Sequence, residues 1–138
     1  MKKLQGILVT FQFIEELLRM YIAYCYKIIS LKVSKFIEFK YSYKDLQKDS
    51  LGTLISHFKK LSKKSSLIKN IEQIIKDRNY CAHEAYLLTY EQQKDSNYLL
   101  KEIKKLDEMI SKTQNCFELL LAEVKQIEEV CKNIHEVK

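Results

Sequence analysis

The last third of the chain carries apolar side chains at alternating intervals of four and three residues, and this seam constrains the fold most strongly. It continues over about five heptads, which is the pattern of a long helix that buries one stripe. At a rise of 1.5 Å per residue the helix would be about 60 Å long. We therefore expect its C-terminal end to fray or to pack on another chain. The seam consists of Leu99, Ile103, Leu106, Ile110, Thr113, Phe117, Leu120, Val124, Ile127, Cys131 and Ile134.

The rest of the chain also favours helices, because it has few turn residues. It contains no proline and two glycines, whereas a β-rich fold needs many such residues at its turns. Residues 37–43 alternate between apolar and polar types and predict an extended, ordered connector. No composition shift or repeat divides the chain, so we expect one domain over residues 1–138. The predicted fold is an all-α, four- to five-helix antiparallel bundle whose last helix is long, with earlier helices at about 4–31, 43–61 and 66–91.

Polar residues mark two of the expected helix starts. Ser42 is followed three residues later by Asp45, which resembles a capping box and predicts the start of the second helix. Asp95 or Ser96 is the predicted N-cap of the last helix.

The composition bears on the kind of partner, on the cellular location and on whether a metal or cofactor is bound. A net charge of +6 suits an anionic partner such as nucleic acid, although a solvated lysine surface would explain it equally. No stretch is long and apolar enough to span a membrane, and no signal-peptide cleavage pattern is present, so a cytoplasmic location without a membrane partner is expected. The four cysteines lie in apolar stretches without metal-ligand spacing, which predicts buried thiols, no metal and no cofactor. They are Cys25, Cys81, Cys116 and Cys131.

The candidate functional motif is RNYCAHEAY, residues 78–86. On a helix, Asn79, His83, Tyr86 and Tyr90 share one face. Arg78 instead interrupts the apolar stripe of the same helix, where an arginine is seldom found unless it is paired or functional. Its long side chain can reach around the helix toward His83.

The motif resembles the active-site signature of the HEPN superfamily, an arginine and a histidine separated by four to six residues, with a polar residue often following the arginine. Here the pattern is Arg78-Asn79-x-x-x-His83. The expected all-helical bundle, the chain length and the Leu-Gly-Thr-Leu-Ile stretch at 51–55 also look like small bacterial members. The resemblance implies a metal-independent endoribonuclease that works as a homodimer, with two copies of the motif facing one cleft. Members of this superfamily act as toxins or in phage defence, commonly with an antitoxin or another partner protein.

The residue types suit this chemistry. His83 titrates near neutral pH and would accept the proton of a ribose 2′-hydroxyl. Arg78 would supply permanent positive charge to the phosphorane transition state. Asn79 would orient His83 or a phosphate oxygen, and Tyr86 would bond a phosphate or stack on a base. Four lysines are candidates for contacts with the RNA backbone: Lys59, Lys60, Lys63 and Lys64.

Two other interpretations stay open. The chain would be a non-catalytic helical dimer that serves as an adaptor or as a module for binding nucleotides or RNA, with Arg78 and His83 pointing away from any shared cleft. It would also fit one half of a toxin–antitoxin or defence pair, which is compatible with the nuclease interpretation. A membrane-binding amphipathic helix ranks last, because the lysines are not segregated opposite one apolar face.

Overall fold

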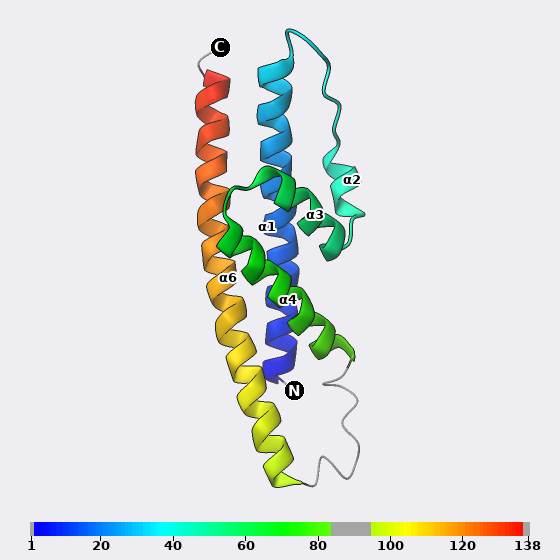
Figure 1. The fold of residues 1–138 in the computed structure, drawn as a ribbon, viewed down its shortest axis with the longest axis vertical. Coiled ribbons are helices and arrows are strands. Elements are labelled where there is room, and N and C mark those ends of the chain that lie inside the picture. Colours follow the sequence, from blue (N-terminus) through cyan, green and yellow to red (C-terminus); the bar gives the residue numbers. More distant parts are fainter. Residues whose placement is uncertain (1, 84–94, 137–138) are drawn as a thin grey trace.

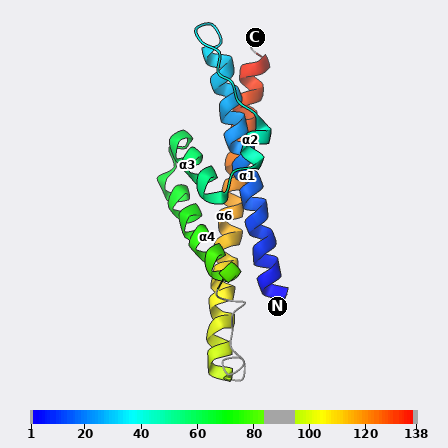
Figure 2. The same cartoon turned by 90° about the vertical axis from the view of Figure 1, so that its right-hand side faces the viewer.

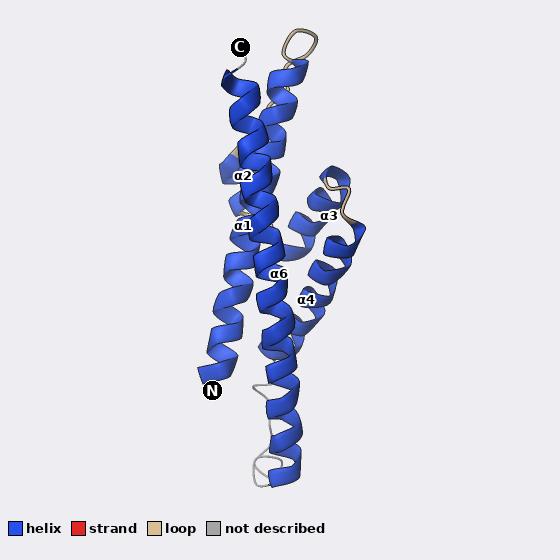
Figure 3. Cartoon of the chain, turned by 90° about the vertical axis from the view of Figure 1, so that its left-hand side faces the viewer, coloured by secondary structure: helices blue, strands red, loops and turns tan. Residues whose placement is uncertain are grey.

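The computed structural model describes residues 2–83 and 95–136, with side chains for 5–81 and 95–134. Within these residues the chain forms helices joined by loops and contains no strand (Figure 3). The all-α expectation and the long C-terminal helix are thereby confirmed. The described helices are α1 (Lys2–Val33), α2 (Tyr43–Gln47), α3 (Leu51–Leu61), α4 (Ser65–His83) and α6 (Ser96–Glu136).

Two long helices form the spine of the fold. α1 and α6 lie side by side and make the most extensive contact between any two elements (Figure 1). α3 and α4 form a helical hairpin that packs on one side of this pair (Figure 2). The hairpin has the antiparallel order expected of a bundle. α1 and α6 instead run parallel, because the chain returns past α1 through the connector and α4 before α6 begins.

The core lies where the hairpin meets the two long helices. Leu18 and Ile22 of α1 and Leu120 of α6 are completely buried. The hairpin contributes Leu54 and Phe58 from α3, and from α4 it adds a second group of fully or nearly fully buried apolar side chains: Leu67, Ile71, Ile74 and Cys81. This placement fixes α4 across one face of the pair of α1 and α6, which decides where the candidate motif lies.

The predicted seam of α6 is buried or half-buried except at Ile103, near its start. Thr113, Val124 and Cys131 are buried, whereas Ile103 is 44% exposed. Figure 1 shows the first turns of α6 reaching beyond the start of α1. The overhang of this helix therefore lies at its beginning, where α1 offers no surface to cover it, and not at its C-terminal end as expected; the helix continues to Glu136.

The second predicted helix, residues 43–61, is wrong as one continuous element. It is divided into α2 and α3 by residues 48–50. Ser42 makes no side-chain capping bond, whereas the side chain of Ser50 accepts a hydrogen bond from the backbone N–H of Thr53 and begins α3. Arg19 of α1 stabilises the break, because its guanidinium donates to the carbonyl oxygens of Leu46 at 3.1 Å and Asp49 at 3.3 Å.

The other two local predictions hold. Residues 37–42 form no helix or strand and connect α1 to α2. Asp95 begins α6, since its side chain accepts hydrogen bonds from the backbone N–H groups of Asn97 and Tyr98. The third predicted helix begins at Ser65, one residue before its expected start, and its expected end near residue 91 lies outside the described residues.

Candidate functional site

Arg78 lies on α4 and faces α1. Its Nη1 atom donates to Oε1 of Glu15 at 3.3 Å, and the two side chains are 35% and 20% exposed. The Nε atom of Arg78 is buried without a hydrogen-bond partner. A guanidinium has five N–H donors, so this ion pair uses a small part of its bonding capacity. Arg78 therefore interrupts the apolar stripe as the sequence predicts, and it is a partly exposed cation with some of its donors unused.

Glu15 belongs to a polar network on the surface of α1. Its Oε2 atom lies 3.6 Å from Nη2 of Arg19, and Arg19 also pairs with Glu16 at 3.4 Å. The other oxygen of Glu16 accepts a hydrogen bond from the hydroxyl of Tyr43. The network joins α4 to α2 across α1 and balances two guanidinium groups with two carboxylates. Arg78 consequently has one carboxylate partner, and it shares that partner with Arg19.

The next two residues of the motif have different surroundings. The side chain of Asn79 is exposed. Tyr80 points toward α6, where its hydroxyl donates to Glu102 and the Nζ atom of Lys105 lies 3.6 Å from the centre of its ring. Two contacts therefore hold the end of α4, one from Arg78 to α1 and one from Tyr80 to α6. Asn79 lies between these two residues and is accessible to solvent.

The two remaining motif positions are only partly covered by the structure. His83 is the last described residue of α4, and its side chain lies outside the described part of the chain. Tyr86 lies outside the described residues altogether. The pairing of Arg78 with His83 and the role of Tyr86 therefore stay predictions.

The four candidate lysines lie at the opposite end of α4 from Arg78. Lys59 and Lys60 occupy the last turn of α3, and Lys63 and Lys64 follow in the loop. From residue 64 to residue 78 the helical rise amounts to about 21 Å. Two of these lysines are already in ion pairs, Lys59 with Glu72 at 2.9 Å and Lys64 with Glu123.

Sequence reasoning missed one buried acid beside the motif. Asp77 is 7% exposed, and its Oδ1 atom accepts a hydrogen bond from Gln73 at 3.2 Å. Its Oδ2 atom is buried without a partner. Burial raises the pKa of the nearby Cys81 thiol to about 11, and the Asp77 carboxylate adds to that rise. The signal in the sequence was the position of Asp77 three residues after Ile74, on the core-facing side of the helix.

The predicted state of the cysteines is confirmed, since all four are buried free thiols. In the part of the chain that the structure describes, no three histidine, cysteine or acidic side chains gather closely enough to hold a metal ion. None of the described helices has the length and apolarity needed to cross a membrane.

Comparisons with known proteins found no relative of this chain. No protein-family model matches the chain. Searches of curated proteins and of solved structures also gave no match.

Proposed function

We propose that this protein is a metal-independent endoribonuclease that resembles the HEPN superfamily and uses Arg78, Asn79 and His83 as its active-site residues. The observation that carries the proposal is the guanidinium of Arg78. It is a partly exposed cation with one shared carboxylate partner, and it lies five residues before the histidine on the same helix. A group that only crosslinked two helices would be expected to satisfy its buried donors, whereas the Nε atom of Arg78 has no partner.

The proposed reaction is an internal transfer of the phosphodiester. The imidazole of His83 accepts the proton of the ribose 2′-hydroxyl, and the 2′-oxygen attacks the neighbouring phosphorus. As the P–O2′ bond forms, the P–O5′ bond breaks, and the leaving 5′-oxygen takes a proton from water. The products are a 2′,3′-cyclic phosphate and a 5′-hydroxyl.

Arg78 would stabilise the charge that develops on the phosphorane oxygens. Guanidinium is a planar fork of donors that matches phosphate oxygens and keeps its charge at any physiological pH. Glu15 would hold the arginine at the surface of α4 before RNA binds. Because Glu15 also contacts Arg19, it would still have a cationic partner when Arg78 turns toward phosphate.

The proposed active form is a homodimer in the cytoplasm, with a toxin–antitoxin or phage-defence role and a possible antitoxin as a further partner. Support for pairing of two copies comes from exposed apolar side chains on α1, the helix that contacts Arg78. Val9 is 47% exposed and Phe13 is 55% exposed. Burial of such side chains is the main driving force of association.

The alternative is a non-catalytic helical adaptor, and the ion pair between Arg78 and Glu15 is the observation in its favour. In that case Arg78 serves to attach α4 to α1, and the resemblance of the motif has no catalytic meaning. This alternative predicts a folded dimer without ribonuclease activity.

The test compares wild type with Arg78→Ala and His83→Ala on a 5′-labelled RNA in excess EDTA. His135→Ala is the matched control, because it removes a histidine from the far end of α6. The proposal expects cleavage by wild type and by the control, and a cyclic phosphate at the new 3′ end. A loss of about 10²-fold or more is expected for each motif variant, in line with the contribution of a general base. Equal cleavage by all four proteins would refute the site, and a folded dimer that cleaves nothing would favour the adaptor.

A further inference from the structure

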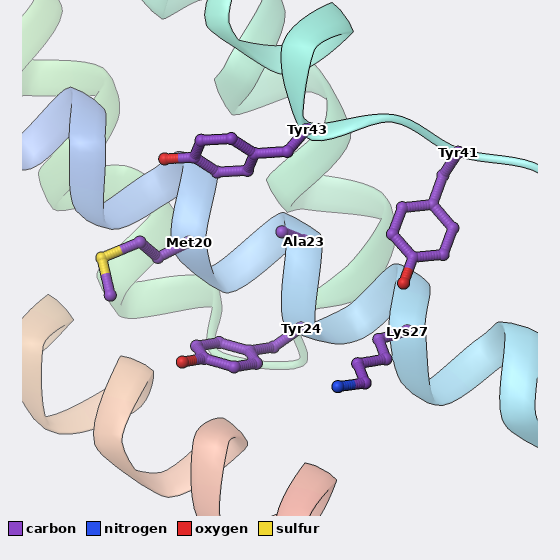
Figure 4. Close-up of a pocket in the computed structure, with 6 residues that line it drawn as sticks. All are labelled: Met20, Ala23, Tyr24, Lys27, Tyr41 and Tyr43. Carbon is purple, nitrogen blue, oxygen red and sulfur yellow. The ribbon is translucent and has the colours of Figure 1, made fainter.

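An aromatic pocket lies between α1 and the segment that leads into α2. Its volume is about 270 Å³, and it is lined by Met20, Ala23, Tyr24, Lys27, Tyr41 and Tyr43 (Figure 4). Ligand pockets commonly measure about 300–1,000 Å³. This pocket therefore has room for one small planar group with a substituent, and not for a longer polymer.

The two walls of the pocket are aromatic. Figure 4 shows the rings of Tyr24 and Tyr43 on opposite sides of the space, with Ala23 between them at its back and Met20 at one end. The small side chain of Ala23 leaves this space open. Each phenol presents the face of a ring, and a planar aromatic ligand placed between them would stack on both sides.

The opposite end of the pocket is cationic. Lys27 is exposed, and it forms no ion pair with any described residue. Tyr41 lies at the same end and directs its hydroxyl toward the side of Lys27 (Figure 4). An anionic group on the ligand would find a cation and a hydroxyl donor there.

Two of the tyrosines that line the pocket, Tyr41 and Tyr43, are held in place by contacts outside it. The ring of Tyr41 packs against Tyr26 at 6.0 Å and Phe39 at 6.2 Å between ring centres. The hydroxyl of Tyr43 donates to Glu16. A phenol is neutral at physiological pH and does not repel an anion, and burial and this hydrogen bond raise the pKa of Tyr43 further, to about 12.

We propose that this pocket binds one nucleotide unit, with the base stacked between Tyr24 and Tyr43 and the phosphate at Lys27. Aromatic side chains facing each other, with a cation at one end, match the shape and charge of a base attached to a phosphate. The unit would come from a free mononucleotide or from an unpaired residue of RNA. The proposal goes beyond ribonuclease activity and does not depend on cleavage by Arg78 and His83.

The test uses the His83→Ala protein, in which any RNA probe stays intact, and the fluorescence of 2-aminopurine, which is quenched by stacking. The probes are 2-aminopurine ribonucleoside, its 5′-monophosphate and a short single-stranded RNA that contains one 2-aminopurine. If the fluorescence of the monophosphate is quenched, the pocket is a site for free nucleotides. If only the fluorescence of the RNA is quenched, it is a site for unpaired bases. If neither the monophosphate nor the RNA is quenched at millimolar protein, the proposal is overturned.

Four further substitutions locate the binding. Tyr24→Ala is expected to weaken it about ten-fold or more, from the usual contribution of one aromatic stack. Ala23→Leu fills the back of the pocket and is expected to abolish binding, while Tyr24→Phe keeps the ring and is expected to bind as before. Lys27→Met is expected to remove the preference for the monophosphate over the nucleoside. If Ala23→Leu is folded by circular dichroism and binds as well as its parent, the ligand lies elsewhere and the assignment is wrong.

Discussion

Replacement of Arg78 by methionine should separate its role in function from its role in stability. Arg78→Met keeps most of the apolar stem of the side chain and removes the charge. The lost ion pair with Glu15 is partly exposed, at 35% and 20% for the two side chains, so it contributes about 0.2–1 kcal/mol to the free energy of unfolding. Glu15 is not left alone, since Arg19 lies 3.6 Å away.

The same substitution removes an unfavourable group. The buried Nε atom of Arg78 has no partner, and an unsatisfied buried donor costs about 1–3 kcal/mol. The two effects have opposite signs and the second is the larger, so we expect the free energy of unfolding to stay the same or to rise by up to about 3 kcal/mol. Ribonuclease activity, in contrast, should be lost.

Urea denaturation followed by circular dichroism at 222 nm measures the change in stability. Glu15→Gln in the same background completes a double-mutant cycle and isolates the energy of the pair. A loss greater than about 2 kcal/mol for Arg78→Met would refute the reasoning, because it would show an ion pair that acts as a main structural contact.

Three further predictions concern stability. Ser50→Ala should lower the free energy of unfolding by about 1 kcal/mol, since it removes the capping bond of α3, whereas Ser42→Ala should have little effect because its side chain caps nothing; urea titrations of both variants give the comparison. Thr113→Val should raise the free energy of unfolding by about 1 kcal/mol, because the Thr113 hydroxyl is buried without a partner, and a lowered melting temperature would contradict this. Burial raises the pKa of three thiols from 9.0 to about 11, so the folded state retains these protons more strongly. The stability that these three thiols contribute is fully present below pH 9 and is lost as the pH rises to about 11. Urea midpoints measured at increasing pH will show this loss for Cys25, Cys81 and Cys116 together.

The long helices could be predicted because their signals are local. The seam of α6 repeats along the sequence itself, and Asp95 lies where an N-cap is needed. The same signal could not show that Ile103 is 44% exposed, since its exposure depends on where α1 begins beside it. Periodicity therefore identified the stripe but not the length over which a partner covers it.

The break between α2 and α3 could not be predicted from local spacing. Its carbonyl groups are bonded by Arg19, which is 27 residues from Leu46 and 30 from Asp49 in the sequence. The apolar positions on either side still fit one helix, so the pattern indicated a single element. Ser50 was the available signal, because a serine three residues before Thr53 can act as an N-cap.

The candidate site shows the same division between local and distant information. The unusual position of Arg78 was visible from the apolar stripe, but its partner Glu15 is 63 residues away. The pocket between Tyr24 and Tyr43 likewise forms only when the connector folds back over α1. Residue types predicted which groups are chemically capable, whereas the contacts between distant segments determine what those groups can reach.

The measurement that tests the central claim most directly is cleavage of two substrates of identical sequence in excess EDTA, one of RNA and one with every 2′-hydroxyl methylated. The account predicts that the protein cleaves the RNA to a 2′,3′-cyclic phosphate and leaves the methylated strand intact, because the 2′-oxygen is the nucleophile. Cleavage of both strands, or of neither by the folded dimer, would contradict it.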